Sequence, residues 1–234
     1  MSSFSQETPE IDKALDIVFQ LVSGLEYAHE HNIFHLDLTP FQIAIVNKNE
    51  VKILNFGLSS LLDYTHIKDV KLLLKILSYV SPEQAGVLKV VPDERSDFYS
   101  LGIIFYELLT GRLPFGGNTV EELLHQHVSQ VPLPPRRFNP EIPEDLEEVV
   151  LKLLGKDPQQ RYQTARGLMS DLEKLRAGET SFVVGKDDFL RKLTYRTRLL
   201  GRDEELAALK DFFAKSREGE GQAVLIAGEA GRGK

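Results

Sequence analysis

DFYSLGIIFYELL, residues 97–109, predicts the centre of the fold. Asp97 and Glu107 are its only charged residues, and its bulky apolar residues cover every face of a helical wheel. A helix that is apolar all round is buried, and this one is shorter than the roughly 20 residues that a bilayer requires. Gly111 and Pro114 predict where it ends. We therefore expect a buried helix in a globular core, with the Asp97 carboxylate at its N-terminal end.

The composition sets the class of protein. The chain has 234 residues, a hydrophobic content of 42% and a formal net charge of −7, with no block of Lys or Arg. This length predicts one domain with a smaller remainder, and the acidic balance argues against nucleic acid or an anionic membrane as the main partner. The absence of Cys excludes disulfides, thiol catalysis and zinc–thiolate sites. With no apolar segment of signal-peptide length, we expect a cytoplasmic protein with no membrane span.

Ahead of the central helix, the chain combines one helix with short β-rich runs. Apolar residues spaced by threes and fours predict an amphipathic helix from Pro9 to about His29. Three β-rich runs follow at 33–34, 43–46 and 51–54, and a polar turn separates the last two, as in a hairpin. The loop 35–42 lies between the first two runs.

After residue 54 the pattern is first irregular and then helical. Residues 55–83 form a long connection without regular periodicity, and connections of this length are usually functional or mobile. Beyond the central helix, capping residues and apolar spacing predict helices at 119–129, 143–154 and 164–175. The fold class is therefore mainly α, a helical bundle around a buried central helix with a small β-hairpin.

Five motifs agree in order and spacing with one known family. They are HLDLTPFQIAI at 35–45, NFG at 55–57, SPE at 81–83, DFYSLG at 97–102 and Arg161 in DPQQRYQTA. Together they resemble the C-terminal lobe (C-lobe) of a bacterial Ser/Thr protein kinase, whose corresponding motifs include H-R-D-L-K-P-x-N, D-F-G and A-P-E. The resemblance covers about Pro9 to Leu175.

The resemblance implies one catalytic and five structural positions. Asp37 stands at the position of the catalytic base, where it could also serve only to brace the loop. The structural positions are His35, Phe56, Glu83, Asp97 and Arg161. Of these, His35 is expected to lie under Phe56 in the core. Glu83 and Arg161 are expected to form a buried ion pair, in which loss of one partner costs about 3 to 5 kcal/mol.

Four positions depart from the family pattern. Asn55 replaces the aspartate and Gln42 replaces the asparagine that hold magnesium, so both candidate cofactor-binding positions are neutral amides. Thr39 stands in place of the lysine that steadies the transferred phosphate, and Leu36 in place of the arginine that receives an activation-segment phosphate. Because Mg²⁺ prefers carboxylates, we expect no metal site and no cofactor in this chain alone. The resemblance implies ATP and Mg²⁺ for intact family members.

A glycine-rich motif lies at the C-terminal end. The predicted strand 223–227 leads into GEAGRGK, which fits the phosphate-binding pattern G-x-x-x-x-G-K. The motif positions are Gly228, Gly233 and Lys234. The Ser or Thr and the helix that complete such a site would follow Lys234, so a glycine-rich tail is the alternative. Together with the kinase motifs, this end resembles bacterial hybrid sensors in which a kinase-like domain precedes an AAA-type ATPase.

Four parts make up the expected domain organisation. Residues 1–8 are a disordered leader, 9–177 a kinase-like C-lobe, 178–198 a linker, and 199–234 the truncated beginning of an α/β P-loop ATPase of the AAA type that ends in the Walker A loop. The eight leading residues are too few for the Gly-rich loop and lysine strand of an N-terminal lobe (N-lobe). We therefore expect a protein partner or a missing N-lobe to complete the C-lobe.

Three functions are compatible with these motifs. The first is a pseudokinase-like scaffold or regulatory module in bacterial signalling, which Asn55, Gln42 and Thr39 favour. The second is an active Ser/Thr protein kinase that transfers phosphate from ATP to protein once an N-lobe is supplied, which Asp37 favours. The third is a regulatory leader of an AAA-type ATPase, which the C-terminal motif favours.

Overall fold

The computed structural model describes residues 9–47, 49–57, 67–86 and 90–189, together with 208, 209, 211, 212 and 215. The chain divides into two compact units, Met1–Leu190 and Arg191–Lys234. The described residues of the second unit are helical and include an ion pair between Lys215 and Asp211. All the elements below belong to the first unit.

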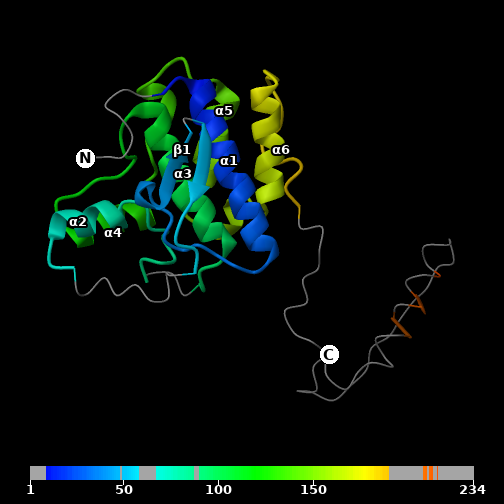
Figure 1. Cartoon of the computed structure of the whole chain (residues 1–234), viewed down its shortest axis with the longest axis horizontal. Coiled ribbons are helices and arrows are strands. Elements are labelled where there is room, and N and C mark those ends of the chain that lie inside the picture. The colour runs from blue at the N-terminus through cyan, green and yellow to red at the C-terminus, as the bar shows by residue number, and fades with distance from the viewer. Residues whose placement is uncertain are drawn as a thin grey trace. The chain divides into compact units, whose positions relative to one another are not determined.

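The first unit is mainly helical, and its described residues hold one two-stranded sheet (Figure 1). Its α-helices are α1 (Ile11–Glu30), α2 (Val70–Leu77), α3 (Glu94–Thr110), α4 (Val120–Ser129), α5 (Glu144–Leu153) and α6 (Ala165–Arg176). Short 3-10 helices are η1 (Pro40–Gln42), η4 (Pro135–Arg137) and η5 (Pro158–Gln160). Strands β1 (Ile43–Val46) and β2 (Glu50–Ile53) pair antiparallel, with Ile43 opposite Ile53. The predicted fold class, mainly α with a small β-hairpin, is confirmed for this unit.

Helix α3 forms the centre of the hydrophobic core. Thirteen of its 17 residues are buried, as its all-round apolar pattern predicts. Asp93 caps its N-terminus by accepting a hydrogen bond from the Arg95 N–H, and Gly111 ends it with a φ of 71°, which glycine adopts without strain. Helices α1 and α5 pack against α3, and α6 packs against α1 and α5. This arrangement places the N-terminal end of α3 beside the loop 35–42.

The helices after α3 begin where the sequence predicts. The Thr119 hydroxyl accepts a hydrogen bond from the Glu122 N–H at the start of α4. The Thr164 hydroxyl accepts one from the Gly167 N–H at the start of α6. Each bond satisfies an N–H group that has no partner within its helix.

Helix α2 is the main departure from the prediction, which expected residues 55–83 to be irregular. The Asp69 carboxylate caps it by accepting hydrogen bonds from the N–H groups of Lys71 and Leu72. A helix of eight residues is marginal alone in water, and α2 packs against α4. The helix is therefore stabilised by this tertiary contact. Eight residues carry too little periodicity for the sequence alone to predict it.

The run 33–34, expected to be β-rich, does not form a strand. The only sheet in the described residues contains β1 and β2 alone, so the run has no partner. The Ile33 N–H instead donates to the Ala28 carbonyl and closes the end of α1.

Gly102 allows α5 to approach α3 closely. A Cβ at this position would lie 2.7 Å from the Leu153 Cβ and 3.1 Å from the Leu154 Cδ2. We predict that Gly102→Ala lowers the free energy of unfolding by about 1 to 3 kcal/mol, the usual cost of overpacking, although alanine is the better helix former. Urea denaturation measures this change.

Gly24→Ala is the matched control for helix propensity. Gly24 is an exposed position within α1, and its Cβ would meet only the flexible end of the Ile53 side chain, at 3.3 Å. This variant should be neutral or more stable by up to about 1 kcal/mol. Equal decreases in the free energy of unfolding for Gly102→Ala and Gly24→Ala would contradict the close packing of α3 on α5.

Candidate functional site

The buried carboxylate of Asp97 holds the loop that carries Asp37. Its Oδ2 accepts a hydrogen bond from the His35 N–H at 2.8 Å, and its Oδ1 accepts one from the Leu36 N–H at 2.7 Å. The His29 Nε2, near the end of α1, also donates to Oδ2 at 2.8 Å. Asp97 is fully buried, so these donors and the N-terminus of α3 replace the water that the carboxylate loses.

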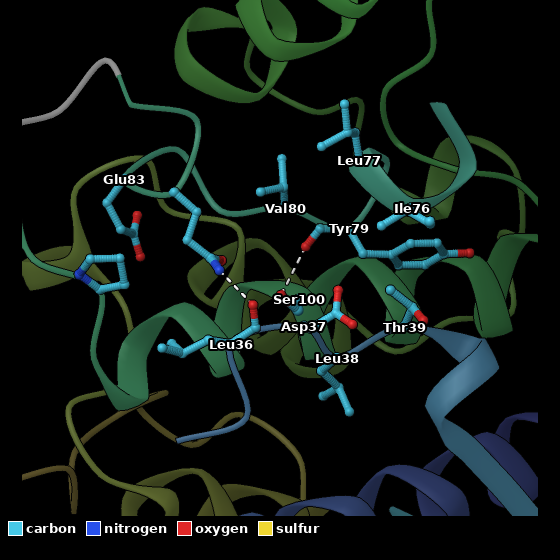
Figure 2. A pocket seen from close by; sticks show the side chains of 12 residues that line it. Leu36, Asp37, Leu38, Thr39, Ile76, Leu77, Tyr79, Val80, Glu83 and Ser100 are labelled. Carbon is cyan, nitrogen blue, oxygen red and sulfur yellow. Dashed lines mark hydrogen bonds between the residues drawn. The ribbon is translucent and has the colours of Figure 1, made fainter. Parts of the chain in front are cut away.

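Leu36 has a left-handed backbone conformation, with a φ of 59°, which is uncommon for a leucine. Its N–H is held by Asp97, and its carbonyl accepts a hydrogen bond from the Gln84 Nε2 at 2.6 Å (Figure 2). The Gln84 Oε1 in turn accepts a hydrogen bond from the Ser81 hydroxyl at 2.8 Å. Hydrogen bonds on both sides therefore stabilise a strained backbone next to Asp37.

Glu83 forms a buried ion pair with Arg161. The Arg161 Nη1 donates to Oε1 at 2.7 Å and Nη2 donates to Oε2 at 2.8 Å. The Ser96 hydroxyl donates to Oε1 at 2.7 Å, and the Arg161 Nε donates to the Gly155 carbonyl at 2.7 Å. Burial by itself raises the pKa of Glu83, but the hydrogen bonds and charge of Arg161, together with Ser96, outweigh it and lower the pKa. Glu83 is therefore ionised at neutral pH.

His35 connects the loop to the turn at Phe56. Its Nε2 donates to the Leu54 carbonyl at 2.8 Å, and its Nδ1 accepts from the Asp37 N–H at 3.3 Å. The His35 and Phe56 rings meet edge-on, with their centroids 4.9 Å apart. Asn55, which precedes Phe56, has a φ of 62°, a left-handed conformation that asparagine tolerates.

Asn55, Gln42 and Asp37 hydrogen-bond to one another. The Asn55 Nδ2 donates to the Gln42 Oε1 at 2.6 Å, and the Gln42 Nε2 donates to the Asp37 Oδ2 at 3.3 Å. The Gln42 oxygen is thus used by Asn55, and Asp37 supplies the one carboxylate of the three. Since Mg²⁺ prefers carboxylates in octahedral geometry, this donor set does not fit the ion that the resemblance implies. The described part of the chain also contains no cluster of three His, Cys, Asp or Glu for a metal.

Asp37 and Thr39 line a cavity of about 390 Å³ between their loop and the end of α2 (Figure 2). Its apolar wall includes Ile76, Leu77 and Val80. The Tyr79 hydroxyl donates to the Glu107 carboxylate at 2.7 Å, and burial and then Glu107 raise the Tyr79 pKa, so the phenol stays protonated. None of the residues found to line the cavity is cationic. Within its described lining, the cavity therefore places the Asp37 carboxylate without a cationic side chain beside it.

Comparison with known proteins identifies the family. The family model described as "Protein kinase domain" matches residues 3–172. This chain belongs to the protein kinase family. The mainly helical fold, with one small sheet, agrees with that assignment.

This kinase-family chain has bacterial relatives. The Serine/threonine-protein kinase PrkC of Bacillus subtilis is 35% identical over 200 residues, which cover 83% of this chain and 30% of the relative. The Serine/threonine-protein kinase PknB of Mycobacterium leprae is 39% identical over 168 residues, 71% of this chain and 27% of the relative. PknB of Mycolicibacterium smegmatis is 38% identical over 169 residues. The chain thus spans less than a third of the length of these curated relatives.

Several residues that hold the site were missed by sequence reasoning. His29 lies 68 residues from Asp97 in the chain, and no local pattern predicts that they meet. Ser96 and Gln84 directly adjoin predicted positions, and this adjacency is the signal that could have found them. Their side chains matter because they connect Glu83 and Leu36 to neighbouring elements.

Other predicted positions lie outside the described residues. They are Gly228, Gly233 and Lys234 of the glycine-rich motif, and the expected leader 1–8. Within the described part of the chain, no helix is both long enough and apolar enough to cross a membrane. The boundaries of the four expected parts stay a prediction.

Asp97→Asn tests whether the Asp97 carboxylate anchors the loop 35–42. We predict that it lowers the free energy of unfolding by about 1.5 to 3 kcal/mol or more, because the amide loses the charge that three donors share. Urea denaturation measures the change. The control Asp12→Asn, at an exposed position of α1, should change stability by less than about 0.5 kcal/mol. A similarly small loss for Asp97→Asn would contradict the anchoring role.

The Glu83–Arg161 pair predicts a pH dependence of stability. The folded pKa of Glu83 lies below its ordinary value of 4.5. Its stabilising contribution is therefore complete above pH 4.5 and is lost as the pH falls through the lowered folded pKa. At neutral pH, Glu83→Gln should cost about 3 to 5 kcal/mol, because it leaves the Arg161 guanidinium buried without its counter-charge.

Urea denaturation of both proteins from pH 7 to pH 3.5 measures this effect. The difference in unfolding free energy between the natural chain and Glu83→Gln should be constant above pH 5 and should narrow below 4.5, the ordinary pKa. A difference that does not change with pH would show that Glu83 is not the group responsible.

Proposed function

We propose that this chain is a protein-kinase-family signalling module with impaired phosphate transfer, a pseudokinase-like scaffold or regulatory piece of a bacterial sensor. The observation that carries the proposal is the hydrogen-bonded series of Asn55, Gln42 and Asp37. In it, two neutral amides occupy the positions from which kinases hold magnesium. The Asn55 amide donates to the Gln42 oxygen, and Asp37 is the one carboxylate of the three.

The size of the expected catalytic loss supports this reading. Removal of one electrostatic contact to a transition state costs about 2.7 to 4 kcal/mol, judged from oxyanion-hole deletions. Three such positions are altered, at Asn55, Gln42 and Thr39. Such losses do not add simply, but a single general base contributes only about 10²- to 10⁴-fold. Asp37 alone is therefore not expected to compensate for them.

Regulation of this module by activation-segment phosphate is not expected. Leu36 replaces the arginine that would bind the phosphate. Its backbone is instead held by hydrogen bonds with Asp97 and Gln84. Because these contacts need no modification, the loop keeps its conformation without phosphorylation.

A protein partner or an N-lobe is the proposed occupant of the hairpin surface. Phe41, Ile45 and Leu54, on and beside the hairpin, are 48%, 47% and 43% exposed. Contiguous exposed apolar patches mark sites of protein interaction, and in this proposal the three side chains contribute to one. This surface adjoins Gln42 and Asn55 in the chain, so its occupant would lie next to the candidate site.

An active Ser/Thr protein kinase is the second candidate, and specific observations favour it. The relatives are Serine/threonine-protein kinases by name, and Asp37 lies in a loop that Asp97 holds in place. Asn55 also keeps the left-handed turn conformation beside Phe56. In this alternative, an N-lobe completes the ATP site and the chain transfers phosphate to protein.

A role as regulatory leader of an AAA-type ATPase, as in cytoplasmic hybrid sensors, is the third candidate. It rests on the GEAGRGK motif alone. Under this proposal, residues 9–177 form the kinase-like lobe, 178–198 the linker, and 199–234 the beginning of the ATPase, with Gly228, Gly233 and Lys234 in its phosphate loop.

Joining the chain to the N-lobe of a relative tests impaired catalysis directly. We predict that the joined protein, with its natural Asn55, Gln42 and Thr39, shows no Mg²⁺-dependent ATP binding by calorimetry. It should also incorporate no labelled phosphate into a generic protein substrate. The chain without an added N-lobe should behave in the same way.

The control restores the family residues in the joined protein as Asn55→Asp, Gln42→Asn and Thr39→Lys. This variant should gain Mg²⁺-dependent phosphate transfer, and Asp37→Ala should abolish the gain. Transfer by the joined protein with its natural residues, abolished by Asp37→Ala, would overturn the proposal and establish the active kinase.

A further inference from the structure

The residues that follow α6 pack against the lobe as a strap, which we define as Ser181–Phe189. The first N–H of the strap donates to the Asp145 carboxylate of α5 at 2.7 Å. The Gly185 N–H donates to the Asp171 Oδ2 of α6 at 2.6 Å, and Val184 packs against the hydrophobic core. The strap therefore contacts both helices, although the sequence predicts a linker here.

Asp188 holds the loop that leads into α6. Its Oδ2 accepts a hydrogen bond from the Gln163 N–H at 2.7 Å. Its Oδ1 accepts hydrogen bonds from both the N–H and the hydroxyl of Thr164 at 3.0 Å. A Cβ at Gly167 would lie 2.5 Å from the Asp188 Cβ, so only glycine lets the strap lie this close to α6.

The same loop carries Arg161. The Gln163 Nε2 donates to the Arg161 carbonyl at 2.8 Å. The Tyr162 hydroxyl donates at 2.7 Å to the Asp171 Oδ2, the oxygen that also accepts the strap N–H. The strap and the Arg161 loop thus share a hydrogen-bond partner and contact each other directly through Asp188.

From Arg161 the hydrogen bonds continue to the candidate site. Arg161 binds both oxygens of Glu83, and the next residue, Gln84, donates to the carbonyl of Leu36, beside Asp37. The contacts connect the strap to the Asp37 loop through one continuous series of hydrogen bonds and peptide links. A displacement at one end of such a series can be transmitted to the other end when its members shift together.

We propose that the strap is a coupling element, whose docking on α5 and α6 sets the rigidity of the loop 35–37. Release of the strap from α5 and α6 would loosen the Arg161 loop and so alter the site around Asp37. The proposal holds whether or not the chain transfers phosphate, because it concerns the loop conformation alone.

Backbone hydrogen exchange in the full 234-residue chain, followed by NMR, tests the coupling. Asp188→Asn should raise exchange of the Gln163 and Thr164 N–H groups by about tenfold, the effect of losing one hydrogen bond to a charged group. It should also raise exchange of the Leu36 N–H by about two- to thirtyfold, the range for mutations along coupled networks. The N–H of Phe105, in the core of α3, should change less than that of Leu36.

Asp187→Asn is the matched control within the strap. It makes the same change of charge, but the Asp187 carboxylate binds Ser170 and Lys174 of α6 and not the loop of Gln163 and Thr164. Exchange of the Gln163 and Leu36 N–H groups should therefore stay within about twofold of the natural chain.

Gly167→Ala tests the coupling without removing a charge. Its Cβ would displace Asp188 while favouring the α6 helix, so the lobe should remain folded and the Leu36 N–H should again exchange faster. Arg166→Ala, at an exposed position one residue earlier, should have no such effect.

Two results would overturn the proposal. In the first, Asp188→Asn and Gly167→Ala both raise exchange at Gln163 and Thr164 but leave the Leu36 N–H unchanged, which would make the strap a passive attachment. In the second, Leu36 and Phe105 change by the same factor, which would show global destabilisation in place of coupling.

Discussion

One buried carboxylate, Asp97, determines the position of the loop that carries Asp37. It joins the last turn of α1 to the loop 35–42 by accepting hydrogen bonds from His29, His35 and Leu36. Because Asp97 is the fourth residue of the most buried helix, its position is fixed by the core and not by the loop. The loop therefore takes its shape from α3, and a left-handed leucine persists beside Asp37 because both sides of its backbone are hydrogen-bonded.

A second set of buried polar contacts extends this scaffold across the lobe. Arg161 connects the loop after α5 to Glu83, and Ser96, next to Asp97, binds the same Glu83. Every member of this set is paired, as buried charges must be if they are not to destabilise the fold. The scaffold uses none of the side chains that family members use for magnesium or phosphate. It is therefore compatible with Asn55, Gln42 and Thr39 at the positions that the resemblance assigns to magnesium and phosphate binding.

This separation explains how a chain can belong to the protein kinase family and still be proposed as catalytically impaired. Phosphate transfer depends on charge placed within a few ångströms of the reacting atoms. Fold stability depends on burial and on polar pairing elsewhere. At the site, two amides meet one carboxylate, Asp37. The residues found to line the neighbouring cavity, which include Asp37 and Thr39, bring no cation. The loop itself is firmly held, and this is the feature on which the proposed module would rely.

The sequence by itself determined the buried central helix, the starts of α4 and α6, the β-hairpin and the family, because each is encoded by local patterns of apolar spacing, capping residues or short motifs. It also predicted the pairing of Glu83 with Arg161, through the resemblance and not through any local pattern. Only the tertiary structure decided that α2 is helical, that 33–34 is not a strand and that His29 reaches Asp97. It likewise decided that the amides of Asn55 and Gln42 bind each other and that residues expected in a linker pack on α5 and α6. These features depend on contacts between residues far apart in the chain, and the free energy of such contacts cannot be read from local periodicity.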